Sequence, residues 1–285
     1  MLQFAGRSKG LNVKRYFSHL TRRVICNRLV YKIYEKTLWN QLKDGDKPEH
    51  IGIILDGNRR WELEQASSKD SHPSFEIGHR AGADKVEELL RWCLALDIKT
   101  ITIYSFSTEN FHRPKEEVEY ILSLLNQRLE KVKTSKDIHE NRVCIRALGR
   151  LNLLPQRTQQ LIKEVEDATK NYDGHYLNIA VAYGGRAEMI DAMKKIAAEV
   201  KNDMLGVDDI DEHVVENNLY TSHLPKSEPD LIIRTSGEER LSGFLLWQAA
   251  YSELCFMDVY WPDFRQIDLL RAVRTYQQRE RRFGT

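Results

Sequence analysis

Six short apolar segments, separated by longer segments with helical periodicity, run through most of this chain. The strand-like segments cover residues 50–55, 100–106, 143–147, 177–182, 231–234 and 254–259. Parallel strands need long crossover connections, which are usually helices, so this alternation is typical of a parallel sheet covered by helices. The sequence therefore predicts an α/β fold whose ligand crevice lies at the carboxyl ends of the strands.

The size and composition fit one large globular domain. The chain has 285 residues, of which 41% are hydrophobic and 30% charged, and it has no apolar run long enough for a membrane-spanning helix. No G-x-G-x-x-G or Walker-type sequence is present, so a dinucleotide or P-loop nucleotide site is not expected. The cysteines lack the paired spacing of zinc sites or disulfide frameworks and stand singly at Cys26, Cys93, Cys144 and Cys255. We therefore expect a soluble cytoplasmic protein.

The amino-terminal segment differs from the rest of the chain in charge. Residues 1–45 hold ten Lys and Arg residues but only two acidic ones, whereas the whole chain has a net charge of +1. Pro48 follows a polar stretch and marks the entry into the folded domain. We predict that residues 1–47 form a basic, partly helical extension and that residues 48–285 form the catalytic domain.

The basic extension suggests a membrane surface more than a nucleic acid. Aliphatic side chains such as Leu29 and Ile33 are interspersed among its basic residues, a composition suited to peripheral contact with anionic lipid. A transit peptide or a mobile solvated tail would have the same composition. No nucleic-acid partner is expected, because basic and aromatic residues are not interleaved later in the chain.

The first strand-like segment carries the strongest candidate site. Residues 50–61 read H-I-G-I-I-L-D-G-N-R-R-W, so the strand delivers Asp56 to the sheet edge just before a Gly-led turn into a helix. Carboxylate is a ligand that Mg²⁺ accepts, and the N–H groups of a helix N-terminus beside two arginines form a site for phosphate. An ordinary turn with an N-cap residue would have the same D-G-N sequence.

Two later strand ends add polar side chains at the same edge. Residues 105–114 read S-F-S-T-E-N-F-H-R-P, which fits either a crevice loop or a capped helix N-terminus. The fifth strand ends in Arg234, and Arg240 and Ser242 follow it closely. Guanidinium groups bind phosphate oxygens in pairs, so these three residues suit a diphosphate, although arginine also pairs with surface Glu.

Residues 80–96 and 116–133 each show an apolar stripe at helical spacing. In the second, Val118, Ile121, Leu122, Leu125 and Leu129 recur with the period of one helix face. Such a stripe usually belongs to the core. A long apolar ligand would instead make these two helices candidates for a tunnel wall.

Six motifs, taken in order, resemble those of the cis-prenyltransferases, which include undecaprenyl and dehydrodolichyl diphosphate synthases. They read D-G-N-R-R-W, S-x-E-N-x-x-R-P, I-R-T-S-G-E-x-R-L-S, F-L-L-W-Q-x-A-Y-x-E-L, W-P-D-F and R-R-F-G and span residues 48–285. The resemblance implies a six-stranded, mainly parallel sheet surrounded by helices, a hydrophobic tunnel and a homodimer. It also implies Mg²⁺-dependent condensation of isopentenyl diphosphate onto an allylic prenyl diphosphate, farnesyl or geranylgeranyl, with new Z double bonds. The product would serve as a polyprenyl carrier lipid for glycosyl groups.

The resemblance further implies roles for individual residues. Asp56 and Glu253 would hold Mg²⁺, while Asn110 and His79 would lie with Asp56 near the reacting carbons. The family's R-x-G end, here Arg282 to Gly284, would reach isopentenyl diphosphate across the dimer. The allylic diphosphate would lie against the 57–60 turn, and isopentenyl diphosphate against the fifth strand. Substrate-binding roles thus fall to Gly57, Asn58, Arg59, Arg60, Trp61, Ser107, Glu109, Arg113, Arg234, Arg240, Ser242, Arg282 and Gly284.

Two positions depart from the family pattern. Phe75 stands where an allylic-phosphate arginine is usual, at the end of a polar 62–77 loop longer than in the bacterial relatives. Loss of one charged hydrogen bond there would weaken diphosphate binding by about 1.5–3 kcal/mol. Gly243 replaces the more frequent Asn, which predicts a looser loop.

Two other functions remain compatible with the resemblance. One is irregular prenyl transfer to another acceptor. The other is the role of a non-catalytic subunit in a heteromeric cis-prenyltransferase. Subunits of that kind lack the D-G-N-R-R stretch, so its presence here favours an enzyme.

Overall fold

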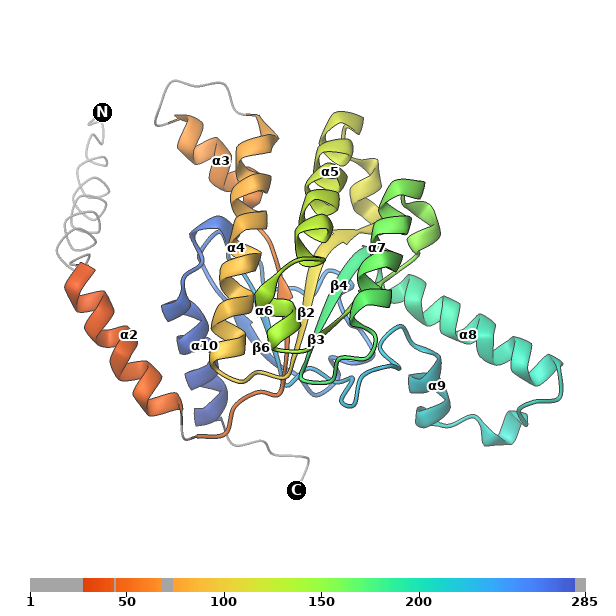
Figure 1. Ribbon diagram of the computed structural model, residues 1–285. Helices are drawn as coiled ribbons and strands as arrows, with labels where there is room; N and C mark the ends of the chain where they lie inside the picture. Colours follow the sequence, from red (N-terminus) through yellow and green to blue (C-terminus); the bar gives the residue numbers. More distant parts are fainter. Residues whose placement is uncertain (1–27, 44, 68–73, 280–285) are drawn as a thin grey trace, which may run out of the picture.

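The computed structural model describes residues 28–43, 45–67 and 74–279 of the chain. Its centre is one six-stranded sheet in which every strand pair is parallel, in the order β3-β4-β2-β1-β5-β6 (Figure 1). This confirms the predicted fold class and all six predicted strands. The strands are β1 (His50–Ile54), β2 (Thr100–Ser107), β3 (Val143–Leu148), β4 (His175–Tyr183), β5 (Leu231–Arg234) and β6 (Glu253–Phe256).

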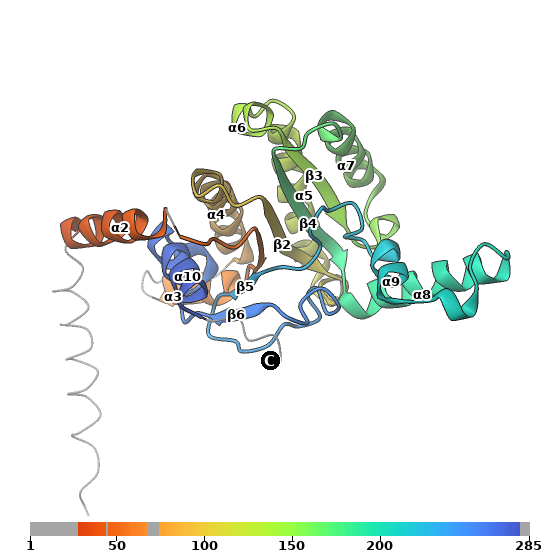
Figure 2. The ribbon, with the colours of Figure 1, turned by 90° about the horizontal axis from the view of Figure 1, so that it is seen from below.

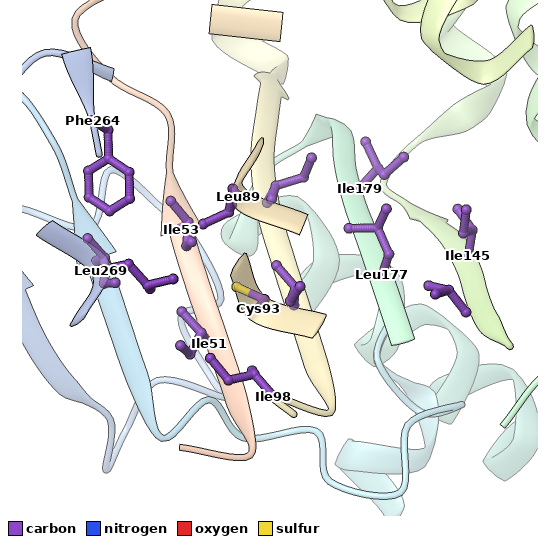
Figure 3. Packing of buried hydrophobic residues seen from close by; sticks show 14 of the residues in the cluster. Ile51, Ile53, Leu89, Cys93, Ile98, Ile145, Leu177, Ile179, Phe264 and Leu269 are labelled. Atoms are coloured by element: carbon purple, nitrogen blue, oxygen red, sulfur yellow. The ribbon is translucent and has the colours of Figure 1, made fainter. Parts of the chain in front are cut away.

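The apolar core lies on one face of this sheet. Successive side chains of a strand point to opposite faces, so Ile51 and Ile53 of β1 point the same way and are fully buried. They belong to one cluster of buried side chains that extends across the sheet to β3 and β4 and includes residues of α4 (Phe75–Ala95) and α10 (Gln266–Gln278) (Figure 3). A smaller cluster on the opposite face gathers around Phe244 and Tyr183.

Most helices cover the core face. Helix α5 (Lys115–Val132) lies beside α4, and α7 (Gln156–Thr169) lies beside α5 (Figure 1). The predicted helices 80–96 and 116–133 correspond to α4 and α5, although α4 begins earlier, at Phe75. In the view from below, α8 and α9 lie on the side away from α10 (Figure 2). The remaining helices are α3 (Asn58–Ser67), α6 (Lys136–Glu140), α8 (Gly185–Lys201) and α9 (Glu212–Asn218).

Helix α2 (Arg28–Leu42) lies within the predicted basic extension and packs against α10 (Figure 1). Leu38 and Leu42 are buried in the core, and the guanidinium of Arg265 lies 5.1 Å from the ring centroid of Tyr31. The carboxyl-terminal part of this helix is therefore built into the fold. The boundary at residue 48 remains a prediction. None of the helices that the structure describes is long and apolar enough to cross a membrane.

Candidate active site

Asp56 occupies the centre of the carboxyl edge of the sheet. It follows β1, which lies between β2 and β5, so the loops after three adjacent strands converge on it. Asp56 Oδ2 accepts a hydrogen bond from Arg234 Nη2 at 2.8 Å, and Asp56 Oδ1 accepts one from Arg60 Nη2 at 3.1 Å. The predicted metal ligand and one arginine from each predicted diphosphate site are thus in direct contact.

These arginines set the charge of Asp56. Burial alone would raise the pKa of the carboxyl group, but the hydrogen bond and charge of Arg234, with the charge of Arg60, outweigh burial and lower it. Asp56 is therefore ionised at neutral pH. The two loops are also tied by Thr235, whose hydroxyl donates to Asp56 O at 2.7 Å and accepts from Asp56 N at 3.1 Å.

The turn at Gly57 aims the start of α3 into the site. Gly57 has φ of +105°, and a Cβ added there would lie 2.7 Å from Tyr260 Cδ1, so the position requires glycine. Trp61 N donates to Gly57 O at 2.9 Å, which closes the first helical turn. The N–H groups of Asn58, Arg59 and Arg60 precede that bond and have no partner within the helix. Such a terminus attracts anions, as predicted.

Arg60 connects α3 to the loop after β5. Its Nη2 donates to Ser236 Oγ at 2.6 Å, and its Nη1 contacts Glu238 Oε1 at 3.2 Å. Glu238 also pairs with Arg240, whose side chain is 65% exposed. The Arg240 guanidinium therefore faces solvent, and it is the main-chain oxygen of Arg240 that accepts a hydrogen bond from Arg234.

Arg234 and Ser242, two of the three residues predicted to hold a diphosphate, are in direct contact. Arg234 Nη1 donates to Ser242 Oγ at 2.7 Å, and the Arg234 side chain is 6% exposed. Ser242 and Gly243 both have positive φ, +50° and +81°. Gly243 O accepts a hydrogen bond from Gly185 N at 2.7 Å. The expectation of a looser loop is therefore not supported: glycine suits this backbone, and the loop is anchored to α8.

The loop after β2 supplies the opposite wall. Asn110 Oδ1 accepts a hydrogen bond from Ser107 N at 2.9 Å, which caps the short helix η1 (Thr108–His112). Burial would raise the pKa of Glu109, but its own N–H and the hydroxyls of Ser107 and Thr108 lower it. The sequence allowed either a crevice loop or a capped helix N-terminus at residues 105–114. The segment is both, because it lines the cleft and contains the capped helix η1.

Glu117 connects the residues of the cleft wall formed by the loop after β2 and the start of α5. It was not identified from the sequence. Its carboxylate is 1% exposed, and Oε1 lies 3.1 Å from His79 Nε2 and 3.0 Å from Arg113 Nη1. Arg59 Nε lies 3.8 Å from the same oxygen. Burial lowers the pKa of His79 despite the nearby carboxylate. In the sequence, Glu117 looks like part of an ordinary acidic first turn.

Most of the predicted residues line one cleft, which has a volume of about 660 Å³, but Arg240 is not among its lining residues. A second cavity of about 400 Å³ runs between α4, α5 and the sheet and is lined largely by apolar side chains such as Val86, Leu90 and Leu125. The two cavities share Leu55, Asn58, His79, Ser105 and Ile121 as lining residues. A polar cleft thus continues into an apolar tunnel between the two helices that the sequence offered as its walls.

Glu253 does not join Asp56 within one chain. It pairs in register with Leu231, which is level with Ile51, so it lies at the amino edge of the sheet and Asp56 lies beyond the carboxyl edge. Its carboxylate forms an ion pair with Arg279. The expected Asp56 and Glu253 metal pair is therefore absent from the single chain. Arg282 and Gly284 lie outside the described residues.

The donor set at Asp56 fits magnesium bound together with a diphosphate. In the part of the chain that the structure describes, no three His, Cys, Asp or Glu side chains cluster to enclose a metal. Mg²⁺ is commonly held by one or two carboxylates together with substrate phosphates, and it seldom uses an all-protein cage. A single ionised Asp56 beside anion-binding N–H groups matches that mode.

Phe75 begins α4 and points away from the cleft. Its ring packs edge-on against Tyr120 of α5, with ring centroids 5.9 Å apart. Trp61 is likewise absent from the residues that line the cleft, and its buried Nε1 has no hydrogen-bond partner in the described chain. The cleft is thus lined by the other predicted residues of the 56–60 turn and of the 105–113 loop, together with Arg234 and Ser242.

Comparison with known proteins gives the family. The profile of the family described as "Putative undecaprenyl diphosphate synthase" matches residues 54–284. The chain is 51% identical, over 278 residues, to a tritrans,polycis-undecaprenyl-diphosphate synthase (geranylgeranyl-diphosphate specific) of Methanopyrus kandleri, covering 98% of this chain and 99% of that protein. It is 50% identical to a protein of the same name from Methanocaldococcus jannaschii, over 92% of this chain and 91% of that protein.

Solved structures agree. Lavandulyl diphosphate synthase from Lavandula x intermedia, in complex with dimethylallyl diphosphate, superposes with a TM-score of 0.78 at 36% identity, covering 84% of this chain and 99% of that chain. A probable undecaprenyl diphosphate synthase from Campylobacter jejuni gives a TM-score of 0.66 at 29% identity, covering 84% and 100%. These matches, together with the cleft and its tunnel, show that the chain belongs to the undecaprenyl diphosphate synthase family and is a cis-prenyltransferase.

Proposed function

We propose that this protein elongates geranylgeranyl diphosphate with successive isopentenyl diphosphate units, in a Mg²⁺-dependent reaction that makes Z double bonds. The observation that carries the proposal is the joining of the polar cleft around Asp56 to the apolar tunnel between α4 and α5. Diphosphate and a long hydrocarbon chain need these two environments side by side. The names of the relatives from M. kandleri and M. jannaschii support geranylgeranyl diphosphate over farnesyl diphosphate as the first substrate.

The condensation joins two carbons and releases a diphosphate. The bond between the allylic carbon and its diphosphate breaks, the double bond of isopentenyl diphosphate attacks that carbon, and one proton leaves the adduct. Bound Mg²⁺ would neutralise the departing diphosphate. The protein has to hold two diphosphates close together and stabilise negative charge, so positioning and electrostatics supply most of the catalysis.

Two groups of residues would hold the two diphosphates. The allylic diphosphate would bind the N–H groups of Asn58, Arg59 and Arg60 at the start of α3. Isopentenyl diphosphate would bind Arg234 and Ser242, which already form a hydrogen bond 2.7 Å long. The carboxylate of Asp56 contacts Arg60 in the first group and Arg234 in the second, and would therefore align the two substrates.

Two side chains of the cleft wall, one from η1 and one from α4, would lie near the reacting carbons. Asn110 and His79 line the cleft, and His79 also lines the tunnel. Because burial lowers the pKa of His79, the imidazole is neutral at pH 7 and suits an environment in which a carbon chain passes. Asn110 would orient the proton that leaves isopentenyl diphosphate.

We also propose a homodimer and a membrane contact. Glu253 lies on the edge strand β6, and its separation from Asp56 within one chain would be overcome if a partner subunit supplied it. The tail with Arg282 and Gly284 would then cross the same interface. The basic arm would bring the enzyme to the membrane, where a polyprenyl carrier lipid for glycosyl groups would be delivered.

The proposal is tested with labelled isopentenyl diphosphate, Mg²⁺ and one of three primers: dimethylallyl, farnesyl or geranylgeranyl diphosphate. We expect polyprenyl products with the highest kcat/KM for geranylgeranyl diphosphate, and no product from Asp56→Ala. No product from any primer would contradict the proposal. Activity of the protein purified alone would exclude a purely non-catalytic subunit.

Irregular transfer is the second candidate, because lavandulyl diphosphate synthase is among the similar structures. The same incubations distinguish it. Mass spectrometry of the dimethylallyl diphosphate reaction without isopentenyl diphosphate would show a branched product in that case. A regular elongase gives none.

A further inference from the structure

Arg128 of α5 bridges the two helices that enclose the tunnel. Its guanidinium forms ion pairs with two residues of α4, Glu87 and Asp84, and Lys131 of α5 lies 3.5 Å from the same Glu87. These contacts cross the α4–α5 seam one to two helical turns beyond His79, where the tunnel meets the cleft. Ion pairs therefore connect α4 and α5 near the middle of their contact.

The Arg128 side chain belongs to the tunnel wall as well as to the surface. Arg128 and Glu87 both line the tunnel, whereas Asp84 is 59% exposed on the outer side of the seam. The Arg128 side chain is only 21% exposed, and its Nε is buried without a hydrogen-bond partner among the described residues. Arg128 thus lines the cavity while its Nη groups contact the acids of α4.

The tunnel is short compared with the product that the relatives' names specify. From His79 to Leu94, α4 spans about 22 Å at about 1.5 Å per residue. An extended chain advances about 1.2 Å per main-chain atom, so an isoprene unit, with four such atoms, needs about 5 Å. The tunnel then holds about four or five units, and an undecaprenyl chain of eleven units needs about 50 Å. A growing chain therefore outgrows the closed tunnel soon after the geranylgeranyl stage.

We infer that the ion pairs of Arg128 with Asp84 and Glu87 form a latch that fixes the spacing of α4 and α5 and thereby limits product length. The inference rests on the proposed function. With the latch closed, units beyond the four or five that fit in extended form must fold within a tunnel of fixed width, and elongation stops when no further unit can be packed. With the latch open, the helices separate at the seam and the tunnel accepts a longer chain.

The test is the product-length distribution of Arg128→Ala and Arg128→Met, measured by mass spectrometry with geranylgeranyl diphosphate, isopentenyl diphosphate and Mg²⁺. We expect both distributions to broaden and to shift upward by one or more isoprene units. The rate of the first condensation is measured in the same variants, so that a change in product length can be separated from a change in primer binding. Arg128→Lys, which keeps a positive charge within reach of both Asp84 and Glu87, should retain the original distribution.

Arg157→Ala is the matched control. Arg157 of α7 pairs with Glu130 of α5, so its loss removes a helix-to-helix ion pair of the same kind on a side of α5 that does not line the tunnel. Product lengths of Arg128→Ala equal to those of the unchanged chain would overturn the latch. So would an equal shift in Arg157→Ala. Absence of polyprenyl products from the unchanged chain would instead refute the proposed function.

Discussion

Arg234 Nη2 lies 2.8 Å from Asp56 Oδ2, although the two residues are 178 positions apart in the chain. The contact is possible because β1 and β5 are neighbours and parallel, so their carboxyl ends meet. Arg60 occupies the other oxygen of the same carboxylate. If a diphosphate binds as proposed, both guanidinium groups would exchange a carboxylate for phosphate oxygens, and Asp56 would become available to the proposed Mg²⁺.

Asp56→Asn should lower kcat by about 100- to 1,000-fold, the usual scale for a lost electrostatic group at a reacting centre. The amide keeps the shape of the side chain but removes its charge, so the requirement for Mg²⁺ should shift to higher concentration. Steady-state kinetics over a Mg²⁺ titration would show both effects.

Glu238→Gln is the control for this substitution. It removes the other carboxylate that pairs with Arg60 and leaves Asp56 untouched. Equal losses in both variants would mean that the release of Arg60, rather than the charge of Asp56, limits the reaction.

Glu117 should be needed to position its neighbours. Glu117→Gln removes the charge that His79 and Arg113 share, and we expect kcat/KM to fall by up to about 100-fold, the scale for a misplaced catalytic group. Glu117→Ala also removes the hydrogen-bond partner of His79 and Arg113 and should lower the free energy of unfolding by about 1–3 kcal/mol.

Denaturant titration and initial rates measure the two effects. The adjacent Glu116→Gln, in the same first turn of α5, serves as the control because Glu116 is exposed. A Glu117→Gln variant with unchanged kinetics would assign Glu117 a purely structural role.

Stability should fall as the pH drops below about 6.5 because of His50. Burial lowers the pKa of His50 from 6.5 to about 4, against the charge of Asp230, so the folded protein keeps this ring neutral where the unfolded chain protonates it. Above pH 6.5 the ring is neutral in both states, and the free energy of unfolding has its full value. Between about pH 6.5 and 4 the unfolded chain gains a proton that the folded protein does not, and the free energy of unfolding falls by up to about 3 kcal/mol.

Thermal melts of His50→Gln over that pH range should show a shallower slope than the unchanged chain. His213→Gln is the control, since the His213 side chain is 86% exposed. If His50→Gln and the unchanged chain had the same slope, other groups would govern the acid sensitivity.

The outward face of α2 should bind anionic vesicles. Val30 and Ile33 are 52% and 59% exposed, and Lys32 and Lys36 are exposed beside them. Ile33→Asp should lower the fraction of full-length protein that floats with vesicles containing anionic lipid, because it adds negative charge to an apolar contact. Exposed Met193→Asp on α8 is the control, and an equal loss there would argue against a specific role for α2.

The sequence predicted those parts of the site that follow from strand ends. Asp56 and Asn110 follow strands and Arg234 ends one, and parallel strands bring such positions together. Glu117 could not be recognised, because its burial depends on how α5 packs on α4 and η1. The position of Glu253 depends on strand register, which places it at the far edge from Asp56. The burial of Leu38 and Leu42 depends on α10, which lies at the other end of the chain.

Helix α4 runs along the tunnel, so its turns recur at regular intervals along the tunnel wall. The helix starts at the cleft, and its pitch of about 5.4 Å nearly equals the length of one isoprene unit. Ala83, Val86, Leu90 and Leu94 line the tunnel at intervals close to one turn. With the hydrocarbon bound along α4 as proposed, each of these positions would contact one further isoprene unit, counted from the diphosphate end.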